Sequence, residues 1–369
     1  RPTSMQRSRS AAPSWPAGER DIVGIGSCTI LRASLRRWLK RPVPSPMTSV
    51  SSPQDIPVLG LTSDSIALRC APALGGRVFS LVNRRSGREW LWRQHGTREL
   101  FRPSDPADFG SGCFAGLDEC VPSVGACRWA DGRKVADHGE LWAKAWTIDD
   151  VDESGFTLSV ESPAFGLRLI RATRLAGSTV RFDYSLANMS SKIAPALWCM
   201  HPLFNWLEGD HLELPETVTR LHVQGVQPAL PASAPDAAVD GATRSGLRPV
   251  IPFPEMLPGV RLDELMLADN DAGFLKAFTD AYRGPVGMAA LWNAGTGDRL
   301  DVRWDSSAAP YLGLWLTRGG YRGWHHVALE PTTAPHDHVD VAVNDPALSA
   351  AVTLAPGERR SWWVEWQVS

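Results

Sequence analysis

The sequence of 369 residues contains no apolar run long enough to cross a membrane as a helix, which takes about 20 residues. Near its start, Ile22 to Leu31 is a short apolar stretch with charged residues on both sides. Arginines follow it and no small-residue cleavage site is evident, which argues against a secretion signal. We therefore predict a protein with no membrane partner and a cytoplasmic location.

Signatures of metal and nucleotide binding are also missing. No glycine-rich loop is followed by Lys-Ser or Lys-Thr, the pattern that cradles phosphates. The cysteines form no CxxC pair and no spacing typical of zinc sites. We predict that they are reduced thiols and that the protein holds no metal and no cofactor. The six cysteines are Cys28, Cys70, Cys113, Cys120, Cys127 and Cys199.

Charge is nearly balanced but unevenly spread. The 38 Lys and Arg residues against 40 Asp and Glu residues give a net charge of −2. Residues 1–46 hold 9 of the basic and 2 of the acidic residues, which leaves 29 against 38, or −9, for the rest. An acidic body argues against nucleic acid as a partner. We expect residues 1–51 to be a disordered or non-native extension, because Met47 opens a more ordinary sequence.

A long hydrophobic pattern with the helical period of 3.6 residues is absent as well. Apolar residues instead alternate with polar ones, which is typical of strands in a sheet with one face in water. We predict an all-β protein, a single large antiparallel β-sandwich over residues 52–369. The alternation is strongest at Phe156, Leu158 and Val160, at Phe165, Leu167 and Leu169, and at Val180, Phe182, Tyr184 and Leu186.

Further strands are predicted on both sides of this region. Residues 83–87 predict a hairpin turn. Two stretches without a clear period, residues 102–137 and 224–258, are interpreted as a long functional connection and as a loop. The additional predicted strands cover residues 65–70, 77–82, 89–92, 274–278, 287–292, 299–304, 311–316, 327–329 and 362–368, the last of which is expected to close the sheet.

Three polar residues stand beside Gly or Pro, where a side chain can face a ligand: His138, His201 and Glu330. His201 ends an apolar run and precedes Pro202, which predicts an imidazole at a strand end, facing a cleft. The alternative is a structural histidine beside a turn. The 16 tryptophans supply flat apolar surfaces, which suit the C–H faces of sugars.

Six segments resemble, in the same order along the chain, those of the aldose 1-epimerase (galactose mutarotase-like) family. The resemblance extends over most of residues 57–369, and it implies the large antiparallel β-sandwich already predicted from the strand pattern. The segments are Gly75-Gly76-Arg77-Val78, residues 87–92, Asp137-His138-Gly139-Glu140-Leu141-Trp142, His201-Pro202-Leu203-Phe204-Asn205, residues 310–315 and Leu329-Glu330-Pro331.

The resemblance implies an enzyme that interconverts the α and β anomers of an aldose. His201 would be the general acid, His138 would help to hold the sugar, and Glu330 would be the general base. Removing a proton from the C1 hydroxyl while protonating the ring oxygen opens the ring, which then closes on the other face. Such a protein needs only a small-molecule sugar as its partner, and we expect a monomer or homodimer.

For the remaining sugar-binding residues, the sequence leaves several candidates. The resemblance adds Asn205 and one acidic residue between residues 260 and 275, for which Asp269 competes with Asp263 and Asp271. Asp137 stands where better-known members of the family have asparagine, and Pro202-Leu203 precede Phe204-Asn205. The residues Arg77, Asp118 and Glu119 are further candidates for substrate binding, although each could equally form a structural salt bridge.

Three other functions compete with the epimerase. One is a non-catalytic sugar-binding or sugar-sensing protein on the same fold. A second is a glycoside hydrolase or lyase accessory domain, but hydrolysis usually needs two opposed carboxylates, and Glu330 is the only convincing one. The third is a metal site, against which we interpret residues 336–338 as a solvated loop. Its ligands would come from His325, His326, His336 and His338 with Asp337.

Overall fold

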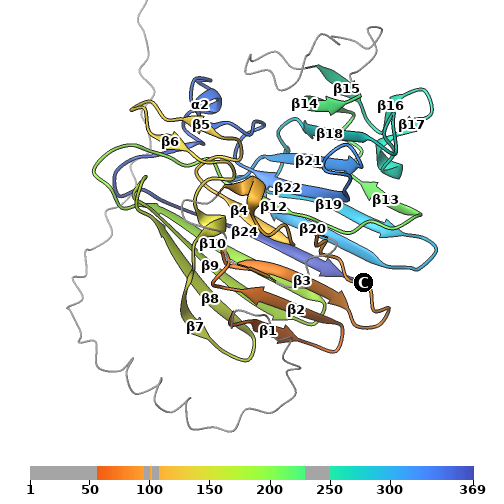
Figure 1. Ribbon diagram of the computed structural model, residues 1–369, viewed down its shortest axis with the longest axis horizontal. Helices are drawn as coiled ribbons and strands as arrows, with labels where there is room; N and C mark the ends of the chain where they lie inside the picture. Colours follow the sequence, from red (N-terminus) through yellow and green to blue (C-terminus); the bar gives the residue numbers. More distant parts are fainter. Residues whose placement is uncertain (1–55, 95–99, 102–107, 229–248) are drawn as a thin grey trace, which may run out of the picture. The chain divides into compact units, whose positions relative to one another are not determined.

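The computed structural model describes residues 56–94, 100–101, 108–228 and 249–369. The predictions for residues 1–51 and for Cys28 lie outside these ranges. The described part consists mainly of antiparallel strands in two large sheets (Figure 1), so the predicted all-β sandwich is confirmed. No helix in these ranges has the length and apolar character needed to cross a membrane.

The larger sheet has eight strands and contains the region where alternation is strongest. Strands β8, β9 and β10 confirm the predictions there. In spatial order the sheet runs β13 (Asp210–Glu213), β19 (Val286–Asn293), β20 (Arg299–Asp305), β24 (Arg359–Val368), β10 (Thr179–Asn188), β9 (Leu167–Ala176), β8 (Gly155–Ser162) and β7 (Thr147–Val151). The C-terminal strand β24 therefore lies inside the sheet, and the expectation that it closes the sheet is wrong.

The second sheet has seven strands drawn from distant parts of the chain. In spatial order it runs β15 (Val250–Pro252), β14 (Arg220–Gln227), β18 (Gly273–Phe278), β21 (Tyr311–Arg318), β22 (His325–Thr332), β12 (Cys199–Pro202) and β4 (Leu117–Cys120). Strands β4 and β14 correct two predictions, since both include residues interpreted as connections. All four residues of β4 are buried, so it has no alternating pattern by which to recognise it.

Smaller elements complete the described part. A three-stranded sheet has the order β1 (Leu59–Thr62), β2 (Ile66–Ala71) and β3 (Arg77–Asn83). The remaining elements are the pairs β5 (Cys127–Arg128) with β6 (Lys134–Val135), β11 (Ala194–Pro195) with β23 (Thr353–Leu354) and β16 (Glu255–Leu257) with β17 (Val260–Arg261), the 3₁₀ turns η1 (Phe109–Ser111), η2 (Leu141–Ala143) and η3 (Leu262–Glu264), and the helix α2 (Val339–Ala342).

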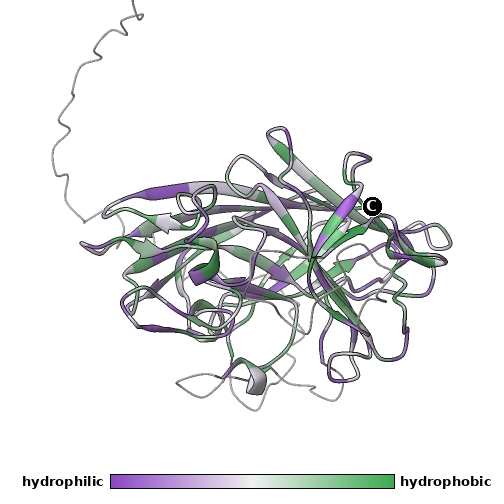
Figure 2. Ribbon diagram, turned by 90° about the horizontal axis from the view of Figure 1, so that it is seen from above, coloured by the Kyte–Doolittle hydropathy of each residue, from purple (hydrophilic) through white to green (hydrophobic). Residues whose placement is uncertain are grey.

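The main hydrophobic core takes side chains from both large sheets. Hydrophobic and hydrophilic residues alternate along individual strands (Figure 2), as in β10, where every second residue is buried over most of its length. On β22, Val327 and Leu329 join the core that also contains Trp366 of the eight-stranded sheet. Because strand residues alternate between faces, His326, Ala328 and Glu330 project from the opposite face of the seven-stranded sheet. Glu330, one of the predicted site residues, therefore lies on that face.

Candidate active site

Three predicted residues form a line across adjacent strands of the seven-stranded sheet. His201 on β12 pairs in register with Asp118 on β4, and Glu330 on β22 lies on the other side of His201. We call these three residues the polar row. β12 ends at Pro202, so His201 lies at a strand end as predicted, but it still pairs with Asp118 within the sheet. The ring nevertheless leaves the sheet on the face away from the core.

His201 and Glu330 are close enough for one ligand to contact both side chains. Nε2 of His201 lies 3.2 Å from Oε1 of Glu330. The carboxylate is fully buried, whereas 11% of the imidazole side chain is exposed. Among the described residues, Oε1 accepts no hydrogen bond, which is unusual for a buried oxygen. A ligand that reaches His201 therefore meets an unsatisfied carboxylate oxygen beside it.

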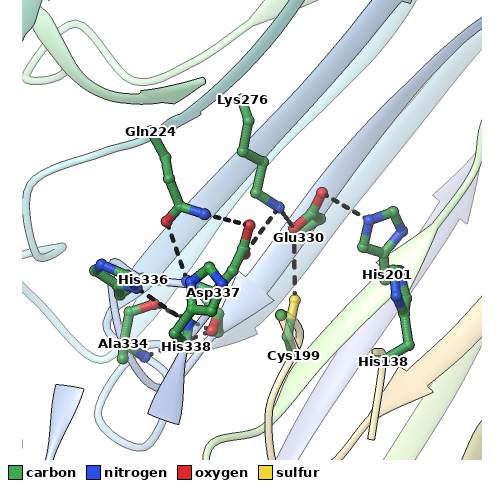
Figure 3. A network of polar contacts seen from close by, with 12 residues as sticks. His138, Cys199, His201, Gln224, Lys276, Glu330, Ala334, His336, Asp337 and His338 are labelled. Atoms are coloured by element: carbon green, nitrogen blue, oxygen red, sulfur yellow. Dashed lines mark hydrogen bonds and ion pairs between the residues drawn. The ribbon is translucent and has the colours of Figure 1, made fainter. Parts of the chain in front are cut away.

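The other oxygen of Glu330 is fully engaged. Lys276 on β18 donates to Oε2, and the Cys199 thiol approaches the same atom at 3.5 Å. The Lys276 ammonium also lies 3.2 Å from Oδ1 of Asp337. Figure 3 shows Lys276 and Asp337 on one side of Glu330, with His201 and His138 on the other. This arrangement turns Oε2 toward the lysine and leaves Oε1 toward the histidines.

The proton affinity of His201 is low in the free protein. Burial lowers the pKa of His201 well below its ordinary value, and the nearby His138 and Lys276 lower it further, while Asp337 acts in the opposite direction. His201 is therefore neutral at neutral pH. Any reaction that needs a cationic His201 must draw its proton from a minor form of the protein or from a ligand.

His138 lies in a turn that is unusual for a residue with a side chain. Its φ of 59° is left-handed, a conformation in which histidine is enriched, and Gly139 follows with a φ of 71°. A Cβ at position 139 would meet the Val121 carbonyl, so only glycine fits there. The His138 ring stacks on Phe109 at 3.5 Å between centroids and lies 5.1 Å from the His201 ring.

Asp137 orients this imidazole. Nδ1 of His138 is 3.0 Å from Oδ1 of Asp137. Burial would raise the pKa of Asp137, but the hydrogen bond and the charge of His138 lower it below its ordinary value. An ionised Asp137 fixes the ring through Nδ1, so Nε2 of His138 is the nitrogen left for other contacts.

The far end of the polar row is an ion pair. Arg77, at the start of β3, lies 2.5 Å from Asp118 and also donates to the Ala115 carbonyl at 2.7 Å. Burial raises the pKa of Asp118, although Arg77 and His138 oppose the shift. Both predicted residues therefore join the group around His201, where they hold the charge of this end near neutrality.

Aromatic side chains lie beside the polar row on the same face. Ala328 precedes Glu330 by two residues on β22 and pairs with Trp315 of β21. Both belong to an apolar cluster that is separate from the main core and that we call the aromatic wall. Its members are Trp92, Phe114, Leu203 and Ala328, with the partly buried Phe109, Trp315 and Trp324 packed against them. Partly exposed rings next to polar groups suit a ligand with one apolar face.

Glu119 lies apart from the group. It follows Asp118 on β4 and points to the opposite face, into the core between the sheets. Its Oε1 accepts hydrogen bonds from Arg171 and Tyr184, both at 2.8 Å, and its Oε2 accepts one from Trp198 at 3.0 Å. With both oxygens occupied and no exposed surface, Glu119 cannot contact a ligand and acts as a core residue.

Asn205 and Asp269 also lie elsewhere. The Asn205 amide donates to the carbonyl groups of Glu89 and Leu91, which ties the chain after β12 to the segment before residue 95. Asp269 is exposed and accepts hydrogen bonds from the backbone of Asp271 and Ala272, within its own turn. Neither side chain is positioned to meet the polar row.

Two residues of the group, Lys276 and Gln224, escaped sequence analysis, and Asp337 was considered there only as a metal ligand. Gln224 on β14 donates to Asp337 Oδ2 at 2.6 Å and accepts from the Asp337 amide at 3.1 Å. Residues 336–338 are therefore not a solvated loop, as predicted, because His336 is buried and Asp337 is held by Gln224 and Lys276. The histidines around Asp337 form no metal-ligand cluster, and none is found elsewhere in the described ranges.

Comparison with known proteins identifies the fold. No protein-family model and no curated protein matches the sequence. Solved structures do match: the Slr1438 protein of Synechocystis sp. PCC 6803 (TM-score 0.59, 18% identity, 88% of this chain and 99% of that one), a galactose mutarotase related enzyme from Lactobacillus acidophilus (0.57, 14%, 85% and 97%) and a galactose mutarotase-like protein from Lactobacillus casei ATCC 334 (0.56, 16%, 85% and 100%). The chain therefore has the galactose mutarotase-like fold, as its resemblance implied.

Proposed function

We propose that this protein is an aldose 1-epimerase, which interconverts the α and β anomers of an aldose. The observation that carries the proposal is the free Oε1 of Glu330, buried and 3.2 Å from the His201 ring. The His201 ring is its polar neighbour, and no hydrogen bond reaches this buried oxygen among the described residues, which leaves it able to accept one from a ligand. The solved mutarotase-related structures support the same class of reaction through the fold alone.

The spacing of the two groups suits this chemistry. In an aldose, the anomeric hydroxyl and the ring oxygen are bonded to the same carbon, so an acid and a base that act on them must stand side by side. Glu330 Oε1 would take the hydroxyl proton while His201 gives a proton to the ring oxygen, which breaks the bond from C1 to the ring oxygen. Rotation about C1–C2 and the reverse proton transfers then close the ring as the other anomer.

The same spacing argues against glycoside hydrolysis. Hydrolases place two carboxyl groups on opposite sides of the bond, about 5 to 9.5 Å apart, with room for a water or a covalent intermediate. Here the other carboxylates of the group are engaged by cations, since Asp337 shares Lys276 with Glu330 and Asp118 is paired with Arg77. One base and one neighbouring acid are sufficient for epimerisation.

The remaining groups would hold the sugar. His138, with Nδ1 fixed by Asp137, would donate or accept through Nε2 next to His201. Asp118 and Arg77 would contact hydroxyls at the far end of the polar row. The aromatic wall would pack against the C–H face of the ring.

A sugar-binding protein without catalysis is the second candidate. It is favoured by one observation, the Lys276 ammonium in direct contact with Glu330, because a paired carboxylate is a weaker base. Such a protein would bind an aldose with the same groups but would leave its anomers to exchange at the uncatalysed rate.

NMR saturation exchange between anomers, over a panel of free and phosphorylated aldoses, separates these candidates. We expect at least one aldose to exchange faster with the protein than without it. Tryptophan fluorescence on the same panel reports binding, since Trp315 and Trp324 belong to the aromatic wall. Binding without faster exchange would favour the second candidate, and neither response would contradict both.

Because His201 is neutral in the free protein at neutral pH, the rate should depend on pH in a definite direction. A mechanism that needs a cationic His201 gains the required proton as the pH falls, so kcat/KM should decrease from mildly acidic toward alkaline pH. On the acidic side the rate should fall as the general base becomes protonated, and the two apparent values belong to the coupled acid and base.

A further inference from the structure

Lys276 reaches Glu330 across a strand that lies between them. On the seven-stranded sheet β21 separates β18 from β22, and Gly313 of β21 pairs with Glu330 on one side and with Phe278 on the other. A Cβ at position 313 would lie only 2.9 Å from Oε2 of Glu330. The missing side chain at Gly313 therefore opens the path along which the lysine and the glutamate meet.

The lysine is anchored from behind. Its ammonium contacts Oδ1 of Asp337, which in turn is held by both polar ends of the Gln224 amide. Only 7% of the Lys276 side chain is exposed. A buried, doubly paired ammonium has little freedom to move, so the position of Oε2 of Glu330 is fixed from β14 and β18 rather than by its own strand.

Lys276 is the only cation in contact with Glu330 among the described residues. The groups that face the carboxylate are His201 and Cys199 from β12, Cys120 from β4, Lys276 from β18, and Asp337 from the segment after β22. His201 is neutral, and burial raises the pKa of both thiols well above the ordinary value, so they are neutral too. Two carboxylates thus depend on one ammonium.

The Lys276 ammonium keeps its charge. Burial would lower the pKa of Lys276, but Asp337 and Glu330 together raise it above its ordinary value. The lysine therefore stays charged over the whole range in which the protein would act. It is also ill suited to be a nucleophile or a base, since both of those roles need a neutral amine.

We propose that Lys276 is a positioning residue that holds Oε2 of Glu330 and so turns its Oε1 toward the sugar, with Asp337 and Gln224 as its support. The proposal rests on the epimerase function and names the residue that orients its base. Without the ammonium, Glu330 and Asp337 would be two buried carboxylates near each other, and one of them would take up a proton at neutral pH. Lys276 accepts no proton from the substrate and gives none to it.

Lys276→Met tests the proposal, because methionine keeps the length of the side chain and removes its charge. We expect kcat at neutral pH to fall about tenfold or more, with a smaller change in KM, and the acidic limb of the pH profile to move up by about one pH unit or more. Lys276→Arg keeps the charge and should leave the limb in place. Lys192→Met removes an exposed lysine charge as a matched control and should change neither quantity.

The double variant Lys276→Met with Asp337→Asn separates electrostatics from packing. Removing the second carboxylate relieves the repulsion, so the acidic limb should return toward its wild-type position. An equal loss of activity in Lys276→Met and in the double variant, without any movement of the limb, would show that the lysine serves packing alone and would overturn the proposal. Circular dichroism and thermal unfolding establish that each variant is folded.

A second measurement does not depend on catalysis. At neutral pH, infrared difference spectra of Lys276→Met should contain the carbonyl band of a protonated carboxyl group, and adding Glu330→Gln should remove that band. Absence of the band, or its removal by Asp337→Asn instead, would contradict the proposal. If the wild-type protein accelerates no anomer exchange, the proposed function fails, while the infrared result still decides the role of Lys276.

Discussion

Glu119 and Glu330 are both completely buried on the seven-stranded sheet, yet their carboxylate oxygens differ in the hydrogen bonds that they accept. Both oxygens of Glu119 accept hydrogen bonds, from Arg171, Tyr184 and Trp198. Glu330 has one oxygen bound by Lys276 and the other without any hydrogen bond among the described residues. We call the fully hydrogen-bonded group around Glu119 the closed network and the group around Glu330 the open network. A fully hydrogen-bonded network has the lowest cost of burial and stabilises one arrangement. A buried oxygen without a hydrogen bond raises the free energy of the folded protein, and a ligand that donates to it lowers that free energy.

The contrast extends to the cations. Arg171 also donates to the Gly76 carbonyl and lies over the rings of Trp146 and Phe182, 5.0 and 5.8 Å from their centroids, so it connects parts of the core. Lys276 instead bridges two carboxylates at the edge of the predicted binding face. Neighbouring residues of one strand can thus serve opposite purposes, as Asp118 and Glu119 do. We expect the two networks to respond to mutation in different measurements.

The largest effect on stability should come from the closed network. Arg171→Met leaves Glu119 as a buried charge without its cation, so the free energy of unfolding should fall by about 3–5 kcal/mol. Denaturant unfolding measures this change. Arg181→Met is the matched control, because its ion pairs with Asp183 and Glu365 are partly exposed, and its cost should stay below about 1 kcal/mol. Equal costs in the two variants would break the comparison.

A smaller effect is expected at the sugar-binding end of the open network. His138→Asn preserves the backbone, since asparagine also tolerates the left-handed region, but it removes the ring that stacks on Phe109. If the residue positions the sugar, KM should rise about tenfold while kcat changes less. Steady-state anomer exchange measures both constants. A loss confined to kcat would assign His138 to the chemical step instead.

A further effect, confined to acidic pH, concerns His326, a buried neighbour on β22. Burial lowers the pKa of His326 to about 3, with a further contribution from His201. In the unfolded chain the imidazole takes up a proton near pH 6.5, whereas in the folded protein it stays neutral down to about pH 3. The free energy of unfolding therefore falls as the pH drops from about 6.5 toward 3, by at most about 1.4 kcal/mol per pH unit. His326→Gln can still accept the Trp315 hydrogen bond and should flatten this slope in unfolding measured between pH 7 and 4. His325→Gln, at the exposed adjacent position, should leave the slope unchanged; an unaltered slope in His326→Gln would contradict the assignment.

Six strands of the eight-stranded sheet could be predicted from the sequence because one face is wet, whereas β7 and β13 were not predicted. In β10, the partly exposed Arg181 and Asp183 alternate with core residues, so the alternation is visible in the sequence. Strand β4 could not be found in this way. Its residues Asp118 and Glu119 are both buried, one beside Arg77 and the other beside Arg171. In a sequence, charged residues that are paired inside a protein cannot be told from charged residues on its surface.

The candidate site was predictable where a motif carried it. His138, His201 and Glu330 come from segments with a family resemblance, and the structure gathers them with Arg77 and Asp118. Lys276 was not predictable, because it stands alone within an apolar strand. Its partner lies 54 residues away and is reached only across Gly313, a juxtaposition set by the register of three strands. A role that depends on the register between strands can be recognised only once the structure is known.

The most direct test of the account compares Glu330→Gln with Glu119→Gln. Glutamine keeps the shape of each side chain and removes its charge and its ability to accept a proton. We predict that Glu330→Gln retains aldose binding and a stability near that of the wild type, while NMR anomer exchange falls by on the order of 10²-fold or more. Glu119→Gln should lose stability while its folded molecules keep their activity. Wild-type exchange rates in Glu330→Gln would contradict the central claim that the open glutamate is the catalytic base.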